Sequence, residues 1–274
     1  MTKKKKNISL PALDAGYSFI DTHCHLDMSA YGDDLDEVIN RAREAGVGRI
    51  LTIGIDLESS GKAIELAGRY ESIYASVGVH PHNVTELNDE VYATLRSMAK
   101  KPGVVAYGEI GIDCVKGYVP LDLQKIHFEK QVLFAKELDL PVIVHDREAH
   151  DDILAILQQA APYPAGGVMH CFSGDAAFAR QVIDLGLYVS IPGVVTFNNA
   201  ATLQEAVETI PLSSLLIETD GPFLSPMPKR GKRNEPASLL FTAQKIAELK
   251  KISLEELARI TSENATNLFR LPLD

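Results

Sequence analysis

Phe19-Ile20-Asp21-Thr22-His23-Cys24-His25-Leu26-Asp27 is the stretch of sequence that decides the fold. Its apolar start is typical of a short β-strand that enters from the segment containing Gly16. Because alternate side chains of a strand share a face, His23 and His25 would point the same way, whereas a helix would turn them apart. Two imidazoles on one strand face can provide half of a metal site. Taken alone, the pair could equally be two polar residues in a loop.

After this strand the chain alternates apolar runs with segments of helical periodicity. Further strands are expected at residues 49–54, 73–79, 104–109, 142–145, 167–170, 187–191 and 215–220. Helices are expected at residues 33–45, 59–70, 86–100, 121–138, 151–160, 175–185, 200–207, 238–249 and 254–268, with Ser59 as the candidate cap of the second.

These strands are apolar nearly throughout, which is typical of parallel strands buried on both faces. Eight strand-then-helix units in a chain of this length predict an α/β fold, a closed (β/α)8 or TIM barrel. An open doubly wound sheet is the structural alternative, but no G-x-G-x-x-G turn follows the first strand. Nothing in the composition marks a second domain. We therefore expect a lysine-rich lead-in at residues 1–18 and one TIM-barrel hydrolase domain at residues 19–274.

The composition is that of an ordinary globular protein, with 46% hydrophobic and 23% charged residues among 274. No apolar run approaches the ~20 residues of a membrane helix, and no apolar segment follows Lys3–Lys6 as in a secretory signal. The three cysteines, Cys24, Cys114 and Cys171, are an odd number without framework spacing, which favours free thiols. We therefore expect a cytoplasmic protein that does not bind membranes.

The formal net charge of −10 argues against a tight, non-specific nucleic-acid binder, whose surface is usually basic. An enzyme that carries divalent cations, however, supplies positive charge at the point of contact. The charge therefore leaves DNA open as a substrate.

Side chains that can bind metals recur at the carboxyl ends of the expected strands. They are His23 and His25 after the first strand, Glu109 after the fourth, His145 after the fifth, His170 after the sixth and Asp220 after the eighth. In a barrel these ends converge on the face where active sites lie. A single histidine at a strand end is more often structural, but such a set predicts a site for two divalent ions, with Glu109 placed to bridge them.

Two ions ~3.5–4 Å apart are a recurring device for displacement at phosphorus. Such ions lower the pKa of a bound water and stabilise charge on the attacking and leaving oxygens. Asp220 is the expected general base, because a carboxylate beside the metal can take the proton of that water. Glu109 and Asp220 are thus the expected catalytic residues.

Other polar residues near this face are candidate substrate contacts. His80 and His82 end the third strand and are expected to contact substrate or to support the ligands, without being primary ligands. Arg147 could clamp a phosphate or form an ordinary surface ion pair. The segment 229–236 follows the eighth strand, where barrels often hold phosphate, although a charged run is usually only a solvated surface. The substrate contacts expected from it are Arg230 and Arg233.

Six blocks of sequence, in order, resemble the TatD family, and the likeness covers nearly all of the chain from Phe19. They are Asp21-Thr22-His23-Cys24-His25-Leu26-Asp27, Gly78-Val79-His80-Pro81-His82, Gly108-Glu109-Ile110-Gly111-Ile112-Asp113, Leu140-Pro141-Val142-Ile143-Val144-His145, His170-Cys171-Phe172-Ser173-Gly174 and Glu218-Thr219-Asp220, followed by a matching tail at residues 230–236. The resemblance implies a barrel deoxyribonuclease of the metal-dependent amidohydrolase superfamily.

The resemblance also implies metal-ligand roles for the same six residues, His23, His25, Glu109, His145, His170 and Asp220. It leaves open whether the two ions are Zn, Mn, Mg or Ni. Cys114 stands where the family usually carries an aromatic residue, and Gly221 where a bulkier small residue is common. Both departures concern the region of the substrate rather than the metals.

The first functional hypothesis is exonuclease-type hydrolysis of DNA, at single strands or strand ends, with no obligate protein partner. The same site could instead attack another ester, a lactone or an amide, for example as an aminoacyl-tRNA deacylase or an amidohydrolase. Relatives of that kind often use a modified lysine where this chain has Glu109. A non-enzymatic binding protein is the third hypothesis, and the presence of all six ligand types argues against it.

Overall fold

The computed structural model describes residues 9–272. Its strands form one parallel sheet in which each strand pairs with the next along the chain. The strands are β1 (Phe19–Cys24), β2 (Val47–Thr52), β3 (Ile73–Val77), β4 (Val104–Asp113), β5 (Val142–Arg147), β6 (Gly167–Met169), β7 (Tyr188–Ile191) and β8 (Leu215–Ile217).

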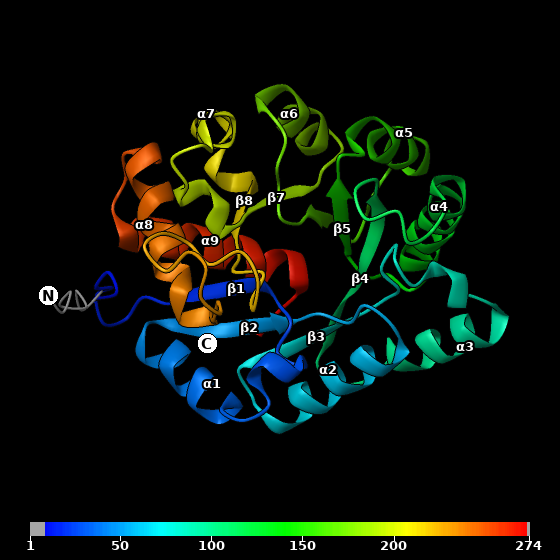
Figure 1. The fold of residues 1–274 in the computed structure, drawn as a ribbon, viewed down its shortest axis with the longest axis horizontal. Helices are drawn as coiled ribbons and strands as arrows, with labels where there is room; N and C mark the ends of the chain where they lie inside the picture. Colours follow the sequence, from blue (N-terminus) through cyan, green and yellow to red (C-terminus); the bar gives the residue numbers. More distant parts are fainter. Residues whose placement is uncertain (1–8, 273–274) are drawn as a thin grey trace, which may run out of the picture.

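The α-helices follow the strands and surround them, as Figure 1 shows. They are α1 (Leu35–Glu44), α2 (Leu57–Arg69), α3 (Asp89–Met98), α4 (Leu121–Glu137), α5 (His150–Ala160), α6 (Ala176–Asp184), α7 (Ala201–Thr209), α8 (Leu239–Lys250) and α9 (Leu254–Phe269).

The sheet closes where the segment after β8 meets β1. The amide of Asp220 donates to the carbonyl of His23 at 2.9 Å, and the amide of His25 donates to the carbonyl of Gly221 at 2.7 Å. These bonds continue the parallel pairing around the last gap, with Cys24 bridged to Gly221. The predicted (β/α)8 barrel is confirmed.

Three expected details differ from the structure. β8 ends at Ile217 rather than at residue 220, and Asp220 itself has a positive φ of 55°, outside the extended conformation. β4 continues to Asp113, which pairs with Arg147 of β5. The expected cap Ser59 is wrong. Asp56 is the N-cap residue, its carboxylate accepts from the Ser59 amide at 2.7 Å, and the Ser59 hydroxyl accepts from the Asp56 amide in return.

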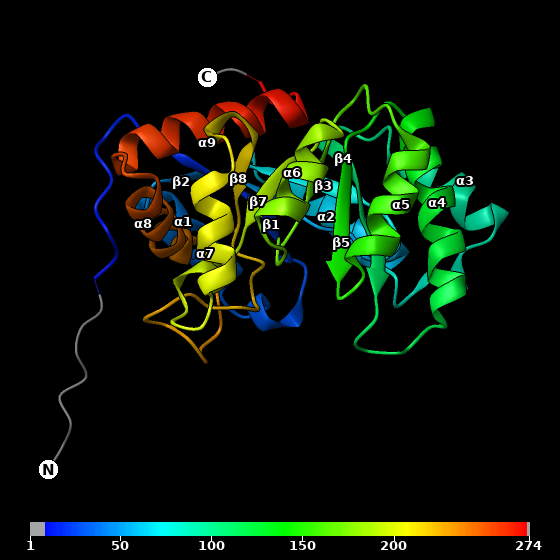
Figure 2. The same ribbon diagram turned by 90° about the horizontal axis from the view of Figure 1, so that it is seen from above.

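The strand residues alternate between two apolar layers. Phe19 packs between the sheet and the helices, whereas Ile20 and Ile143 point into the barrel. At the end where the strands begin, Leu268 and Phe269 of α9 pack against these interior residues. Figure 2 shows α9 lying across that end. The interior of the barrel is therefore a packed core that α9 closes at the end where the strands begin. The opposite rim, at the carboxyl ends of the strands, is where barrels carry their active sites.

Two expectations concern regions that the structure does not test. Lys3–Lys6 lie outside the described residues, and the division into a lead-in and one domain of residues 19–274 stays a prediction. Within residues 9–272, no helix combines the length and the apolar character needed to cross a membrane.

Candidate metal centre

The six predicted metal-binding side chains gather at the carboxyl end of the barrel. They are brought there by the ends of β1, β4, β5, β6 and β8, because parallel strands deliver their last residues to one rim. Three groups have donor atoms that all lie within 4.8 Å of one another, namely His23 with His25 and Asp220, His23 with Glu109 and His170, and His80 with Glu109 and His145.

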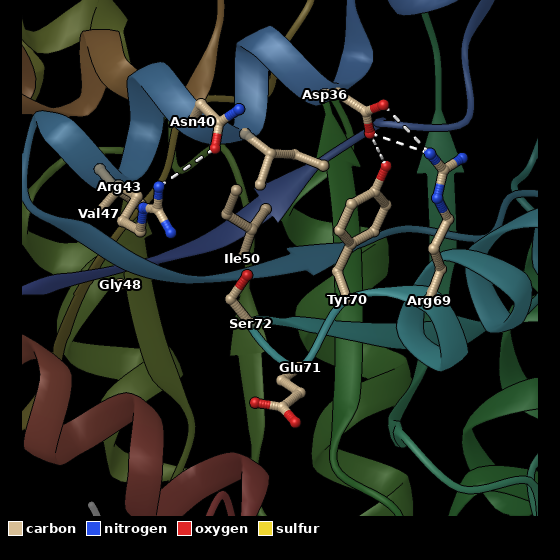
Figure 3. A pocket seen from close by; sticks show the side chains of 11 residues that line it. Asp36, Asn40, Arg43, Val47, Gly48, Ile50, Arg69, Tyr70, Glu71 and Ser72 are labelled. Atoms are coloured by element: carbon tan, nitrogen blue, oxygen red, sulfur yellow. Dashed lines mark hydrogen bonds and ion pairs between the residues drawn. The ribbon is translucent and has the colours of Figure 1, made fainter.

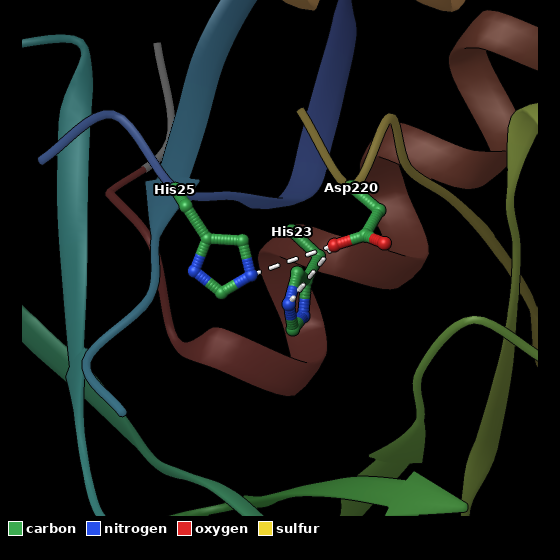
Figure 4. A group of neighbouring side chains, drawn as sticks. All are labelled: His23, His25 and Asp220. Carbon is green, nitrogen blue, oxygen red and sulfur yellow. Dashed lines mark ion pairs between the residues drawn. The ribbon is translucent and has the colours of Figure 1, made fainter. Parts of the chain in front are cut away.

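The first group lies at the seam between β1 and β8. Nε2 of His25 lies 3.5 Å from Oδ1 of Asp220, and Nε2 of His23 lies 3.8 Å from the same oxygen. Figure 4 shows both imidazoles turned toward the Asp220 carboxylate. Oε2 of Glu109 faces this group, at 3.4 Å from Nε2 of His23 and 3.9 Å from Nε2 of His25.

The other oxygen of Glu109 faces a second set of imidazoles. Oε1 lies 2.6 Å from Nδ1 of His145, 3.1 Å from Nε2 of His170 and 3.5 Å from Nε2 of His80. One buried carboxylate thus lies between two sets of nitrogen donors and presents one oxygen to each. This arrangement suits a carboxylate that bridges two cations.

His80 is closer to this centre than the sequence led us to expect. Its Nδ1 accepts from the amide of His82 at 3.2 Å, which leaves Nε2 turned toward Glu109. His80 is therefore a candidate ligand as well as a candidate substrate contact. The signal was available, because His80 follows β3 as His25 follows β1 and His170 follows β6.

Two carboxylates that hold the histidines were missed by the sequence analysis. Glu218 accepts from the Cys171 amide at 2.7 Å and lies 3.1 Å from Nδ1 of His170, which turns Nε2 of that ring toward Glu109. Asp113 lies 2.8 Å from Nε2 of His82 and 3.7 Å from Nε2 of His145. Such partners fix the orientation and tautomer of a ligating imidazole.

Asp21 ties the first candidate ligands to the end of β8. Its carboxyl accepts from the amide and hydroxyl of Thr219 at 2.9 and 2.5 Å and from the His23 amide at 3.3 Å. Burial raises the pKa of Asp21 to about 7, although these hydrogen bonds oppose the change. The contact keeps β1 and the Thr219-Asp220 turn in register.

A close approach of β4 to β5 sets the distance between Glu109 and His145. Gly111 pairs with His145 and has a positive φ of 155°. A Cβ at Gly111 would lie 1.9 Å from the carbonyl oxygen of His145. Only glycine fits here, because any side chain would push the two strands apart.

The charges in the centre support one another. Burial alone would raise the pKa of Glu109 and lower that of His170. Because the carboxylate and the protonated imidazole attract each other, the pKa of Glu109 is instead held well below its usual range and that of His170 well above it. Burial would also raise the pKa of Asp220, yet His25 and His170 keep it low. Both carboxylates are therefore ionised at neutral pH.

Several buried ring nitrogens of the centre have no hydrogen-bond partner among the described residues. Within residues 9–272, both ring nitrogens of His23 and Nδ1 of His25 are buried without a hydrogen bond. Leaving buried polar atoms unpaired is costly. Clustered imidazoles and carboxylates are the ligands that Zn²⁺ and related divalent ions favour, so these residues fit such ions.

The comparison with known families agrees with this geometry. The model of the family described as "TatD related DNase" matches residues 20–270. The chain belongs to this TatD-related DNase family.

Relatives of this TatD-family chain cover almost its whole length. A Bacillus subtilis protein, "Uncharacterized metal-dependent hydrolase YabD", is 44% identical over 92% of this chain and 98% of its own. The "3'-5' ssDNA/RNA exonuclease TatD" of Erwinia tasmaniensis is 37% identical over 92% of this chain and 99% of its own. The crystal structure of the TatD homologue YJJV from Escherichia coli has a TM-score of 0.88 and 32% identity, covering 93% and 98% of the two chains.

The predicted substrate contacts in this TatD-family chain divide into two kinds. Arg147 is exposed at the end of β5, and Arg230 lies over the Phe197 ring at 4.2 Å; neither makes an ion pair within residues 9–272. His82 is held by Asp113 as described above. Arg233, in contrast, pairs with both oxygens of Asp34 at 2.7 Å. Its guanidinium is therefore already engaged by α1.

Two cavities lie in very different places. The larger, about 640 Å³, lies between α1 and the end of α2, where Asp36 is held by Arg69 and Tyr70 (Figure 3). It is remote from the barrel mouth, and its Asp36 and Arg69 pair with each other. The smaller, about 210 Å³, is lined by Cys171, Phe172 and the start of α7. Neither cavity is lined by a candidate metal donor.

Proposed function

We propose that this chain is a metal-dependent phosphodiester hydrolase that degrades DNA from the free ends of single strands. The observation that carries the proposal is the position of Glu109, whose two oxygens face two separate sets of imidazoles. That arrangement suits a pair of divalent ions, Zn, Mn, Mg or Ni, which would lower the pKa of a water and stabilise charge on phosphate oxygens.

The chain's own residues then have distinct tasks. His23, His25 and Asp220 would hold one ion, His145 and His170 the other, and Glu109 both. The low pKa of Asp220 keeps its carboxylate ionised, so Asp220 can accept the proton of the attacking water. Glu218 and Asp113 are positioning residues that orient His170 and the His145–His82 pair.

DNA is favoured as the substrate by three observations. The matched family is described as DNases, and the Erwinia relative is named a 3'-5' ssDNA/RNA exonuclease. Arg147 and Arg230 remain available for phosphates. The cysteines of the chain are free thiols, which supports the proposed cytoplasmic location.

Hydrolysis of a different bond is the second candidate. The net charge of −10 and the pairing of Arg233 with Asp34 both weaken attraction for a polyanion. A two-ion site of this kind can also attack a carbonyl carbon, so another ester, a lactone or an amide is the alternative substrate. An aminoacyl-tRNA ester offers the same carbonyl chemistry, but as a polyanion it is not favoured by the charge.

A fluorescent single-stranded oligonucleotide tests the proposal. We expect laddering with manganese or magnesium that a chelator abolishes. His145→Ala and Asp220→Ala should each lower kcat by at least about 100-fold, because each removes a ligand or the proton acceptor. His127→Ala in α4 is the matched control and should retain full activity.

Full activity in either site variant, with an unchanged circular dichroism spectrum, would remove these residues from the mechanism. Absence of DNA cleavage together with metal-dependent turnover of an ester or lactone would establish the second candidate instead.

A further inference from the structure

We propose that Phe223 and Tyr118 stack on unpaired nucleobases on the two sides of the phosphate held at the metal centre. Phe223 lies in the loop after β8, and Tyr118 lies in the loop after β4. The inference rests on the proposed function and adds to it a pair of base-binding residues.

Both rings are unusually exposed for large aromatic side chains. Phe223 is 48% exposed and Tyr118 is 67% exposed. Each also has an exposed apolar neighbour in its own loop, Leu224 beside Phe223 and Val115 near Tyr118. Apolar surface gathered at the mouth of a barrel marks a binding site more often than a chance exposure does.

The two rings stand at opposite ends of one continuous row of rings. Starting from Phe223, the row passes through His25, His23, His170, His145, His80 and His82 to Tyr118. Successive ring centroids are 6.0, 5.1, 3.7, 5.8, 4.5, 4.3 and 4.8 Å apart. The imidazoles in the middle of the row are the candidate metal donors. Phe223 therefore adjoins His25 of the first donor group, and Tyr118 stands one ring beyond His80 of the group around His145, so each half of the centre has an exposed aromatic ring next to it.

The charge of the chain favours a contribution from stacking. The chain carries a net charge of −10, and Arg233 is already paired with Asp34, so the protein offers a DNA strand little long-range attraction. Stacking of bases on aromatic rings provides affinity without regard to sequence, because every base has a π-face.

Stacking also explains a preference for single strands. In a duplex each base is already stacked and paired, so its faces are covered. Only an unpaired or terminal base can present a face to Phe223 or Tyr118. The two rings would thus select unpaired or terminal bases over the bases of a duplex.

The test compares two single-stranded substrates within each enzyme. One is an ordinary oligonucleotide, and the other carries abasic tetrahydrofuran residues on both sides of each terminal phosphodiester. We expect the wild-type chain to prefer the intact strand in kcat/KM by about 5- to 100-fold. Phe223→Ala and Tyr118→Ala should each reduce that preference, and Tyr118→Phe should keep it because the ring remains.

The ratio of the two substrates cancels any general damage to the metal centre. Tyr17→Ala is the matched control, because Tyr17 is a 43% exposed aromatic residue at the opposite end of the barrel, just before β1. It should keep the wild-type preference.

Three outcomes would overturn the inference. A wild-type chain without preference, or alanine variants that keep the preference, would show that the rings do not bind bases while leaving the nuclease proposal intact. A wild-type chain that cleaves neither strand with any added metal would overturn the proposed function, and the base-binding role with it.

Discussion

Single residues decide how the centre is organised, and Glu109 is the clearest case. The sequence places it at a strand end, which is enough to expect it near the histidines. In the structure, the two oxygens of Glu109 face two different sets of donors. This division depends on the close approach of β4 and β5 at Gly111, and the position of Glu109 in the sequence does not predict that approach. The roles of the ligands and of the substrate contacts remain proposals.

Glu218→Gln tests the support of the centre at this scale. The amide can still hydrogen-bond to His170 but no longer carries the charge that makes the imidazole a better donor. We expect metal affinity, measured by titration with manganese or zinc, to fall about 10- to 100-fold. The matched variant Glu205→Gln, on the outer helix α7, should bind metal as the wild type does. Equal affinity in both variants would contradict the assignment.

The elements were largely predictable, and their ends were not. Apolar runs and helical periodicity located all eight strands and the helices that follow them. β8 was expected to be longer because Glu218, Thr219 and Asp220 continue the run in sequence. In the structure it ends at Ile217, and Asp220 has a positive φ that composition does not reveal. Glu218 and Asp113 were missed because orienting a histidine leaves no spacing signal along the chain.

The start of α5 carries a pH-dependent contact. Nδ1 of His150 lies 2.7 Å from Oδ2 of Asp146, and this hydrogen bond raises the pKa of His150 above 6.5. A raised folded pKa gives stability that is present below pH 6.5 and is lost as the pH rises through the folded value.

His150→Gln should therefore cost more stability at pH 6 than at pH 9. The difference should be small, ~0.3–1 kcal/mol, because the side chain is partly exposed and solvent screens the pair. Urea unfolding at the two pH values measures it. His127→Gln is the control of opposite sign, since burial lowers the pKa of His127 and its protonation opposes folding at low pH. The same pH trend in both variants would refute the argument.

At the scale of the whole molecule, the barrel is confirmed, whereas the negative net charge does not follow from the fold. The barrel followed from counting alternating units, because eight strand-then-helix units in a chain of this length are typical of a closed barrel. Which loops reach the mouth, and which cations are already paired, could not be predicted, since ion pairs such as Arg233 with Asp34 join residues about two hundred positions apart.

Salt dependence tests the charge argument at this scale. Arg147→Ala and Arg230→Ala should each raise KM for single-stranded DNA and reduce the slope of log KM against log salt by about 0.7, the value for one phosphate contact. Arg43→Ala removes the same charge from the remote cavity between α1 and α2 and should leave the slope unchanged. A slope that falls equally in all three variants would mean that only the overall charge matters.

The backbone pairing of Asp220 and Gly221 with His23 and His25 has a consequence for when the site can form during synthesis of the chain. During translation the amino-terminal histidines leave the ribosome long before the aspartate that completes their half of the site. If the proposed centre is correct, a chain that ends before Asp220 would lack it, and hydrolysis would begin only after the segment following β8 has paired with β1.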